Sequence, residues 1–444
     1  MKKILVAIGI SLILFFIAQF GFSTQHAILI ALIGLMVTLW TNEALPLGVV
    51  SLFPILLFPM FDILDTNATA SNYSKSIIFL FLGGFMIAIA TQKIGLHKVV
   101  AHKLLSIFPN TQRGVIFSLS ITSAFLSAVI SNTTTALLLI PIAIFLAKDI
   151  QLKARFVLAI AYGASIGGIM TPIGTPPNLI LLGFLQDRSI EMVSFVKWMG
   201  LTMPLAIFML IIIPFILSLG TSKYELDHSA LSVEKVTKEQ KRLLYILLSL
   251  VILLLVNSPI KPYYNGLGLS EQGILLGYGL LMFMPKIGFL QWSDSKNIPY
   301  EIIFLFGAGF SIANAFSHTG LAQEIANNLL FFTSFEPFIV ILLVASLITF
   351  TTEVTSNTAL ISIALPIIYA LGEASNVDTG LLLMTATICA SYAFMLPIAT
   401  PPNAIALSSG VIKIKQMAGF GFLFNILGIF AITVTALYYW AFFL

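Results

Sequence analysis

Long apolar runs are the feature that most restricts how this chain can fold. The 444 residues are 59% hydrophobic and 9% charged, with a mean hydropathy of +1.03. About 20 apolar residues suffice to cross a bilayer as a helix, and lipid requires every backbone polar group of a spanning segment to be satisfied internally. The sequence therefore predicts an all-α polytopic membrane protein and excludes the soluble globular classes. Eleven crossings are predicted, over 4–20, 26–41, 45–61, 76–94, 154–185, 197–220, 243–258, 265–285, 300–316, 378–410 and 416–443.

Two further long segments, 113–147 and 338–372, are apolar at both ends and polar in the middle. They carry SNTTT from Ser131 and TTEVTSNT from Thr351 at their centres. Irregular backbone at membrane depth is tolerated only where it is buried in protein or lines a watery cavity. Both segments are therefore interpreted as re-entrant helical hairpins, each made of two half-helices that meet at a polar tip. The alternative, in which these serines and threonines only join transmembrane helices, explains a single SNT better than two.

Each polar tip also predicts an anion-binding site. Serine and asparagine are preferred N-caps because their side chains satisfy backbone N–H groups at the start of a helix. Each SNT precedes an apolar, helix-compatible run, so each tip should place a helix N-terminus inside the protein. Such an end carries about half a positive charge and presents unpaired N–H groups, which attract anions.

The two hairpins belong to an internal repeat. Shifting the sequence by 225 residues aligns SNT at 131–133 with SNT at 356–358, PIGTPPN at 172–178 with PIATPPN, and IIFLFLGGF at 77–85 with IIFLFGAGF. Five full crossings in each copy, an odd number, predict that the two copies are inverted in the membrane. We divide the chain into a first transmembrane helix at 1–20, a first repeat at 21–221, a polar cytoplasmic connector at 222–242 and a second repeat at 243–444.

Lysine and arginine residues set the orientation, because cytoplasmic segments of membrane proteins hold most of them. With the N-terminus in the cytoplasm, 18 of the 22 fall in predicted cytoplasmic segments, and the exceptions are Lys75, Arg188, Lys197 and Lys261. We therefore predict a cell (inner) membrane protein with a cytoplasmic N-terminus, an external C-terminus and no nucleic-acid surface. The basic, apolar start is also compatible with a cleaved signal peptide, although its long apolar run favours an uncleaved helix.

The motifs PIGTPPN and PIATPPN interrupt the crossings at 154–185 and 378–410. Consecutive prolines lack N–H donors and push the preceding residue out of the α region, so both crossings are predicted to be broken helices. A simple kink explains one proline but not a duplicated TPPN. The carbonyl groups freed at such breaks, together with Thr and Asn oxygens, can coordinate sodium.

The predicted hairpins and broken helices lack basic side chains. No Lys or Arg occurs in 114–147, 156–187 or 297–412. Two helix ends together supply about one positive charge, which leaves a bound dianion undercompensated in a medium of low dielectric. Two or more bound sodium ions would supply the missing charge. The sequence therefore predicts obligatory coupling, in which sodium binds first and creates the substrate site.

Glu353 is the acidic residue of the second tip, and a carboxylate inside a membrane is a functional candidate by default. Its repeat mate is Ala128. The sequence leaves three roles open for it. These roles are to form structural hydrogen bonds, to attract a nearby cation by its negative charge, or to bind and release protons that are coupled to transport.

The paired SNT motifs, TEVTSNTA at 352–359 and MLPIATPPNAIAL at 395–407 together resemble the divalent anion/sodium symporter family, whose members transport dicarboxylates, citrate or sulfate. The stretch NEALPLGVVSLFPILLFPMF at 42–61 is similar to the early helices of that family. The resemblance covers most of the chain. It implies a homodimer in which a scaffold domain and a mobile transport domain, each drawn from both repeats, work as an elevator.

The resemblance also implies a binding site without catalytic residues, in which backbone carbonyls supply many of the sodium contacts. The match departs at Thr355, whose repeat mate is Ile130, and this argues against side-chain ligation there. Substrate carboxylates would contact Asn132, Thr133, Ser356, Asn357, Thr358, Thr400 and Pro401. One sodium ion would be held by Ser127, Ser131, Asn132 and Gly174, and a second by Thr352, Thr355, Asn357 and Ala399.

We therefore predict a secondary active transporter that imports four-carbon dicarboxylates, such as succinate, malate and fumarate, together with sodium. Citrate and sulfate are alternative substrates. Dicarboxylate exchange and proton coupling through Glu353 are alternative mechanisms, although the motifs lack the basic groups that exchangers of the family place where sodium sits. A membrane-embedded enzyme is disfavoured because the five histidines lie near span ends or in loops and no HExxH metal motif occurs.

Overall fold

The computed structural model describes residues 1–42, 44–105, 107–191, 193–226, 236–258, 264–328 and 335–443, and these residues form helices without any β-strand. Residues 227–235 of the predicted connector and Lys261 lie outside the described residues. The first part of the chain forms α1 (Lys2–Ala18), α2 (Thr24–Asn42), α3 (Leu47–Val50), α4 (Phe53–Met60), α5 (Thr66–Ser71), η1 (Asn72–Ser74), α6 (Ser76–Ile94) and α7 (Leu96–Leu105). It continues with α8 (Gln112–Ser127), α9 (Asn132–Phe145), α10 (Ile150–Ile169), α11 (Pro176–Asp187) and α12 (Phe195–Ser218).

The second part of the chain begins with α13 (Lys238–Asn257), α14 (Glu271–Leu281), η2 (Trp292–Asn297), α15 (Tyr300–Thr319) and α16 (Leu321–Asn328). It ends with α17 (Pro337–Thr352), α18 (Asn357–Ala374), α19 (Thr379–Ala390), α20 (Pro401–Ser408), α21 (Ile414–Tyr438) and η4 (Trp440–Phe442). Each helix from α15 to α21 is a counterpart of one from α6 to α12.

Helix bounds recur at the shift of 225 residues. The helices α8 and α17 begin and end at equivalent positions, and the starts of α9 and α18 and of α11 and α20 are also equivalent. Gly95 (φ 72°) and Gly320 (φ 79°), again equivalent, end α6 and α15 in the left-handed conformation. Glycine adopts this conformation without the steric penalty of a Cβ atom. Similar local sequence therefore starts and stops helices at matching places in both halves.

The helix interruptions lie where the polar and proline motifs predict them. Residues 128–131 separate α8 from α9, and residues 353–356 separate α17 from α18. Residues 170–175 separate α10 from α11, and residues 391–400 separate α19 from α20. In both broken helices the prolines occupy the first positions of the following helix, where an N–H has no helical partner in any case. The helices are thus interrupted at both TPPN motifs.

Helix lengths establish a multi-pass membrane protein, although two predicted crossings differ in form. The crossing at 45–61 consists of α3 and α4, because Pro54 restarts the helix after a turn. The crossing at 265–285 is helical only in the 11 residues of α14, which starts late because Ser270 caps it. Among the described residues, seven helices are long and apolar enough to span a membrane: Thr24–Asn42, Thr66–Ile94, Ile150–Ile169, Phe195–Ser218, Tyr300–Thr319, Asn357–Ala374 and Ile414–Phe442.

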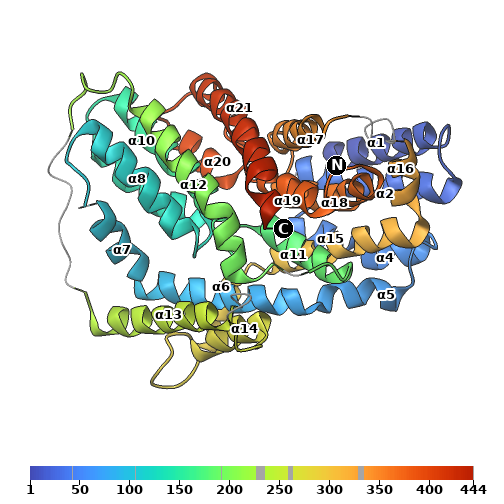
Figure 1. Cartoon of the computed structure of the whole chain (residues 1–444), viewed down its shortest axis with the longest axis horizontal. Helices are drawn as coiled ribbons and strands as arrows, with labels where there is room; N and C mark the ends of the chain where they lie inside the picture. Colours follow the sequence, from blue (N-terminus) through green and yellow to red (C-terminus); the bar gives the residue numbers. More distant parts are fainter. Residues whose placement is uncertain are drawn as a thin grey trace.

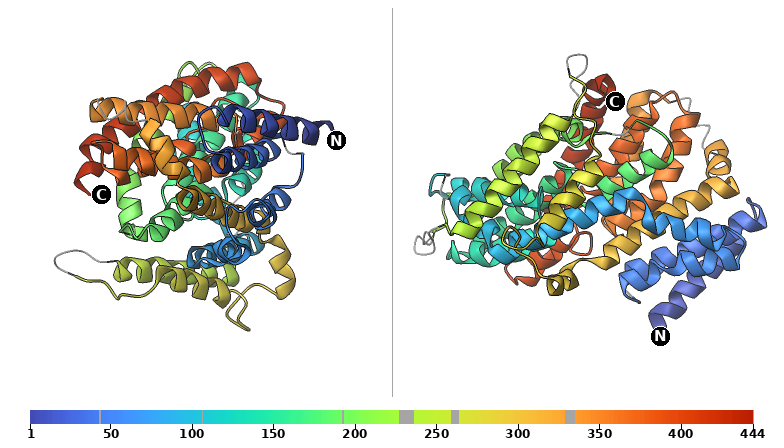
Figure 2. Two further views of the ribbon diagram at one scale, coloured as in Figure 1. Left: turned by 90° about the vertical axis from the view of Figure 1, so that its right-hand side faces the viewer. Right: turned by 90° about the horizontal axis from the view of Figure 1, so that it is seen from below.

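Apolar side chains pack into two clusters. The larger one is built mainly from α6, α8 to α14 and α17 to α21, and the smaller one mainly from α1 to α4 with α15. In Figures 1 and 2, α6, α13 and α14 form a layer along one side, and α8, α10 and α12 lie together above it. The paired helices α1 and α2 lie at the far end of the molecule from α8.

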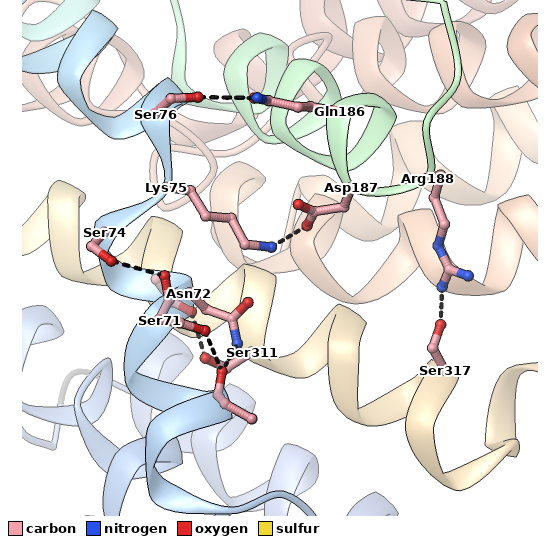
Figure 3. A network of polar contacts seen from close by, with 12 residues as sticks. Ser71, Asn72, Ser74, Lys75, Ser76, Gln186, Asp187, Arg188, Ser311 and Ser317 are labelled. Atoms are coloured by element: carbon pink, nitrogen blue, oxygen red, sulfur yellow. Dashed lines mark hydrogen bonds and ion pairs between the residues drawn. The ribbon is translucent and has the colours of Figure 1, made fainter.

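Polar side chains join two uninterrupted helices to the end of a broken one (Figure 3). Lys75, at the N-cap of α6, forms an ion pair with Asp187, the last residue of α11. The guanidinium group of Arg188 contacts the Ser317 hydroxyl of α15. These contacts tie the second fragment of the first broken helix to α6 and α15.

The packing of α6 against α14 yields a test of the fold. A Cβ atom on Gly279 would lie 2.6 Å from Gly83 Cα, whereas a Cβ atom on Gly277 in the same helix meets nothing within 4 Å. We expect Gly279→Ala to lower the free energy of unfolding by about 1–3 kcal/mol, because two backbones must separate, and Gly277→Ala to have little effect. Thermal unfolding in detergent can be followed by a thiol-reactive dye on Cys389, which is buried. Equal midpoints for the two variants would contradict this packing.

Candidate functional site

The tip of the first hairpin, residues 128–131, lies between α8 and α9. Ser131 caps α9 by accepting a hydrogen bond from the N–H of Thr134 (3.2 Å), as its residue type predicts. Across the tip, the hydroxyl of Ser127 donates to Asn132 Oδ1. The last residue of one half-helix is therefore bonded to the first residue of the next.

The tip of the second hairpin, residues 353–356, has an equivalent contact. Thr352 Oγ1 lies 2.6 Å from Asn357 Oδ1 and 2.9 Å from the carbonyl oxygen of Ala390. Ser356 stands at the N-cap of α18 without a side-chain capping bond. A hydroxyl before the tip and an amide after it are thus paired in both halves, although the hydroxyl belongs to serine in one half and to threonine in the other.

Each broken helix is bridged by the asparagine that ends its TPPN motif. Asn178 Nδ2 donates to the carbonyl oxygens of Gly168 (2.9 Å) and Thr171 (2.8 Å), on either side of the end of α10. Asn403 repeats both bonds at equivalent carbonyl oxygens, 3.0 Å and 3.1 Å away. Both asparagines are fully buried, and among the described residues their Oδ1 atoms have no hydrogen-bond partner. The amides thus satisfy carbonyl groups that each break removes from its helix.

The two halves of the chain interlock around these tips. The half-helix α9, which starts at the first tip, packs against α20, which starts at the second TPPN motif. In the opposite sense, α18 starts at the second tip and packs against α11 from the first half. Figure 1 accordingly shows α20 among helices of the first half and α11 beside helices of the second. The predicted site is therefore built across both repeats.

The residues predicted to contact substrate share one location, the N-cap or first turn of a helix. The N–H groups of a first turn have no helical partners and point out of the helix end. The polar side chains at the starts of α9 and α18 therefore lie beside unpaired donors, whereas α20 begins with two prolines and its Asn403 N–H donates to Thr400 Oγ1. The residues are Asn132 and Thr133 in α9, Ser356, Asn357 and Thr358 at the start of α18, and Thr400 and Pro401 at the start of α20; Thr358 and Thr400 are buried.

The residues predicted to hold sodium form two sets of oxygen donors that are equivalent except at Ser131 and Thr355. Each set contains the paired hydroxyl and amide of one tip. Among the described residues, the carbonyl oxygens of Gly174 and Ala399 accept no backbone hydrogen bond outside the helices. Thr355 Oγ1 donates to the carbonyl oxygen of Thr351 (2.8 Å), so its proton is used within the turn. Hydroxyl, amide and carbonyl oxygens suit a hard cation, and the described part of the chain contains no cluster of three or more His, Cys, Asp or Glu that could hold a metal ion.

The geometry gives Glu353 a structural role among those that the sequence left open. Its carboxylate belongs to a residue that is 3% exposed. It accepts hydrogen bonds of 2.7 to 2.9 Å from the backbone N–H groups of Phe394, Met395 and Leu396 and from Asn425 Nδ2. Glu353 thus fastens the second tip to the interruption between α19 and α20 and to α21.

Sequence reasoning missed side chains that support the first tip from outside the duplicated motifs. Gln92 of α6 donates to Thr134 Oγ1 (3.1 Å), and Thr171 Oγ1 donates to the carbonyl oxygen of Ala128 (2.6 Å). Thr171 directly precedes the motif PIGTPPN, and this adjacency is the one sequence feature that could have pointed to it. Its equivalent in the second half is Leu396, so duplication gave no reason to select it. Nothing in the local sequence marks Gln92.

The fold resembles a known membrane transporter. It matches the crystal structure of the YdaH transporter from Alcanivorax borkumensis, which is described as having an unusual topology, with a TM-score of 0.60. The match covers 84% of this chain and 87% of that one at 14% identity. Apolar spanning helices, paired interruptions and this fold define a multi-pass membrane protein.

The family follows from sequence comparison. A family model described as a citrate transporter matches residues 35–388. The sodium-dependent dicarboxylate transporter SdcS of Staphylococcus saprophyticus is 31% identical over 93% of this chain and 86% of its own length. SdcS of Staphylococcus aureus is 31% identical over 90% of this chain and 83% of its own. The chain belongs to the divalent anion/sodium symporter family, as its duplicated motifs predicted.

The asparagine bridges yield a test of the site. Asn178→Ala or Asn403→Ala removes a donor from two carbonyl groups, of which that of Thr171 or Leu396 keeps a backbone N–H partner at 3.3 Å. We therefore expect each variant to lower the free energy of unfolding by about 1–3 kcal/mol. Asn67→Ala, at an exposed position of α5, is the control and should unfold with the wild type. Thermal unfolding in detergent measures the difference. A wild-type midpoint for both bridge variants would show that the breaks do not depend on these amides.

Proposed function

We propose that this protein imports dicarboxylates together with sodium. The observation that carries the proposal is the pair of equivalent hairpin tips, each of which joins a hydroxyl to an amide at the start of a half-helix. The two relatives named above are sodium-dependent dicarboxylate transporters by name. Their names support both the coupling ion and the class of substrate.

Charge balance supports the role of sodium. The hairpins and broken helices contain no Lys or Arg within 114–147, 156–187 or 297–412. The N-termini of α9 and α18 contribute about half a positive charge each, so a bound dianion keeps an excess of about one negative charge. Two sodium ions, one behind each tip, would more than offset it. In this proposal the first is held by Ser127, Ser131, Asn132 and Gly174, and the second by Thr352, Thr355, Asn357 and Ala399.

The two tips also favour a four-carbon substrate with a carboxylate at each end. Each tip offers the amide of Asn132 or Asn357, neighbouring hydroxyls and the N–H groups of one helix start. Succinate, malate and fumarate would present one carboxylate to each tip. Citrate carries a third carboxylate for which the duplicated tips provide no third set of donors. The remaining substrate contacts in this proposal are Thr133, Ser356, Thr358, Thr400 and Pro401.

Uptake into proteoliposomes tests the proposal. We expect labelled succinate to accumulate with an inward sodium gradient and not when choline replaces sodium, because the site lacks another source of positive charge. Unlabelled malate and fumarate should compete more strongly than citrate or sulfate. Uptake that is indifferent to sodium would contradict the proposal, and uptake that requires preloaded dicarboxylate would indicate an exchanger.

Variants of the tips connect this assay to the proposed site. Asn132→Ala and Asn357→Ala each remove the amide that pairs with a hydroxyl across a tip, so both should abolish uptake. Asn67→Ala on α5 is the matched control and should transport as the wild type does. Size-exclusion chromatography should show the same homodimer for all three proteins. Full uptake by both tip variants would remove the site assignment.

We also propose an elevator mechanism in a homodimer of the cell membrane, with the N-terminus in the cytoplasm and the C-terminus outside. The moving unit would contain α8 to α12 and α17 to α21, which carry the interruptions and brace them. The framework would contain α1 to α7 and α13 to α16. The contacts of Ser76 with Gln186, Lys75 with Asp187 and Arg188 with Ser317 in Figure 3 lie between these two groups. They would have to break and re-form during each transport cycle.

Cross-linking across this boundary tests the motion. Gln186 Nε2 of α11 lies 3.0 Å from Ser76 Oγ of α6. In a Cys389→Ala background, which removes the natural thiol, we expect Ser76→Cys with Gln186→Cys to be joined by a short thiol cross-linker and uptake to stop. A reductant that cleaves the linker should restore uptake, and each single-cysteine variant should be unaffected. Undiminished uptake by the cross-linked protein would contradict the elevator mechanism.

A further inference from the structure

The carboxylate of Glu353 accepts hydrogen bonds from a group of N–H donors, and the first half has no equivalent carboxylate because Ala128 stands at that position. Backbone N–H groups of residues 394–396 lack helical partners because α19 ends at Ala390 and α20 begins at Pro401. These three groups and Asn425 Nδ2 all donate to the Glu353 carboxylate. A carboxylate offers about four lone-pair positions. Phe394, Met395 and Asn425 all donate to Oε1, and the Leu396 N–H alone donates to Oε2, so four bonds hold the carboxylate in place.

The segment that Glu353 captures is also fixed from its other sides. Asn403 donates to the carbonyl oxygen of Leu396 (3.1 Å). The backbone of α21 packs directly against the segment at Gly421, because a Cβ atom there would lie 2.2 Å from the carbonyl oxygen of Phe394. Asn425, one turn further along α21, reaches the carboxylate. Glu353 thus closes a contact in which the hairpin tip, the interruption and α21 are fitted together.

This contact adjoins the residues proposed to hold the second sodium ion. Thr352, the preceding residue, lies 2.6 Å from Asn357 Oδ1 and 2.9 Å from the carbonyl oxygen of Ala390. Ala399, the proposed backbone ligand, is three residues beyond the captured segment. The orientation of both chain segments therefore depends on where the Glu353 carboxylate holds them.

We propose that Glu353 is the positioning residue of the second sodium site and acts through the segment that it holds. This inference rests on the proposed function. Because four hydrogen bonds fix residues 394–396 and Asn425 around the carboxylate, the site is ordered before sodium arrives, and a preordered site binds more tightly. The first tip is held by a different contact. Ala128 is the equivalent of Glu353, and its carbonyl oxygen accepts a hydrogen bond from Thr171 Oγ1 (2.6 Å). The two sodium-binding steps should accordingly respond differently to mutation at Glu353.

The test is the sodium dependence of succinate uptake by Glu353→Gln. Glutamine keeps one accepting oxygen but turns an NH₂ group toward the N–H of Leu396, so part of the captured segment is released. We expect the half-saturating sodium concentration to rise roughly tenfold, as the loss of a charge-assisted hydrogen bond implies. The KM for succinate at saturating sodium and the pH profile of uptake should match the wild type. Glu336→Gln, which removes an exposed carboxylate from the N-cap of the same helix α17, is the control and should change none of these values.

Three results would overturn the inference. An unchanged half-saturating sodium concentration would do so, and a lower maximal rate without a sodium shift would show a general structural role. Loss of the pH dependence of uptake would show that Glu353 carries protons. Wild-type uptake without sodium is a separate result, which would remove the proposed function itself.

A milder variant keeps the inference testable if Glu353→Gln does not fold. Asn425→Ala removes one of the four donors and leaves the backbone donors in place. Sodium binding to the folded protein raises its unfolding temperature, so the sodium concentration that produces a given rise reports affinity. We expect Asn425→Ala to need more sodium than the wild type for the same rise. An identical sodium response would contradict the positioning role.

Discussion

The structure depends on how it satisfies backbone polar groups where its helices are interrupted. An N–H or carbonyl group that is buried without a partner is costly in apolar surroundings. Each interruption releases such groups, and side chains take the place of the missing helical partners. Asn178 and Asn403 bridge carbonyl groups, while Glu353 collects N–H groups. These bonds fix the shape of the breaks and so fix the helix starts that follow them.

The two halves share their motifs but differ in what braces them. In the first half, Trp198 Nε1 of α12 donates to the carbonyl oxygen of Ile169 (2.9 Å). In the second half, Asn425 of α21 donates instead to Glu353 (2.7 Å). The equivalent of Asn425 is Gly200, which has no side chain to offer. Duplicated residues therefore supply the common binding chemistry, and unduplicated residues make the two sites unequal.

A site without basic side chains also suits a protein that must release its substrate. Helix ends and neutral oxygens hold an anion only when cations complete the charge balance. Under the proposed function, release of sodium on the inner side would weaken substrate binding, and no basic side chain would have to move away from the substrate. Lys75 and Arg188 lie instead at the C-terminal end of α11, where Lys75 pairs with Asp187 and Arg188 contacts Ser317. Their contacts link helix groups that the elevator mechanism separates.

Most of the helical framework could be predicted from the sequence because its signals are local. Apolar runs set the spans, Gly95 and Gly320 end equivalent helices, and Ser131 caps α9 as expected. The duplicated TPPN motifs located both broken helices, because proline has no backbone N–H and cannot donate the helical hydrogen bond. The crossing at 265–285 was predicted too long because its apolar composition concealed the late helix start at Glu271.

The sequence by itself determined where helices start, stop and break, and which polar residues are duplicated. Only the tertiary structure decided that α9 packs on α20 and α18 on α11, so that each tip meets a fragment from the other half. It also decided the role of Glu353, whose partner Asn425 lies 72 residues away. The physical reason is that helix caps and proline breaks act within one turn of the chain. A hydrogen bond between distant segments exists only after packing has brought them together.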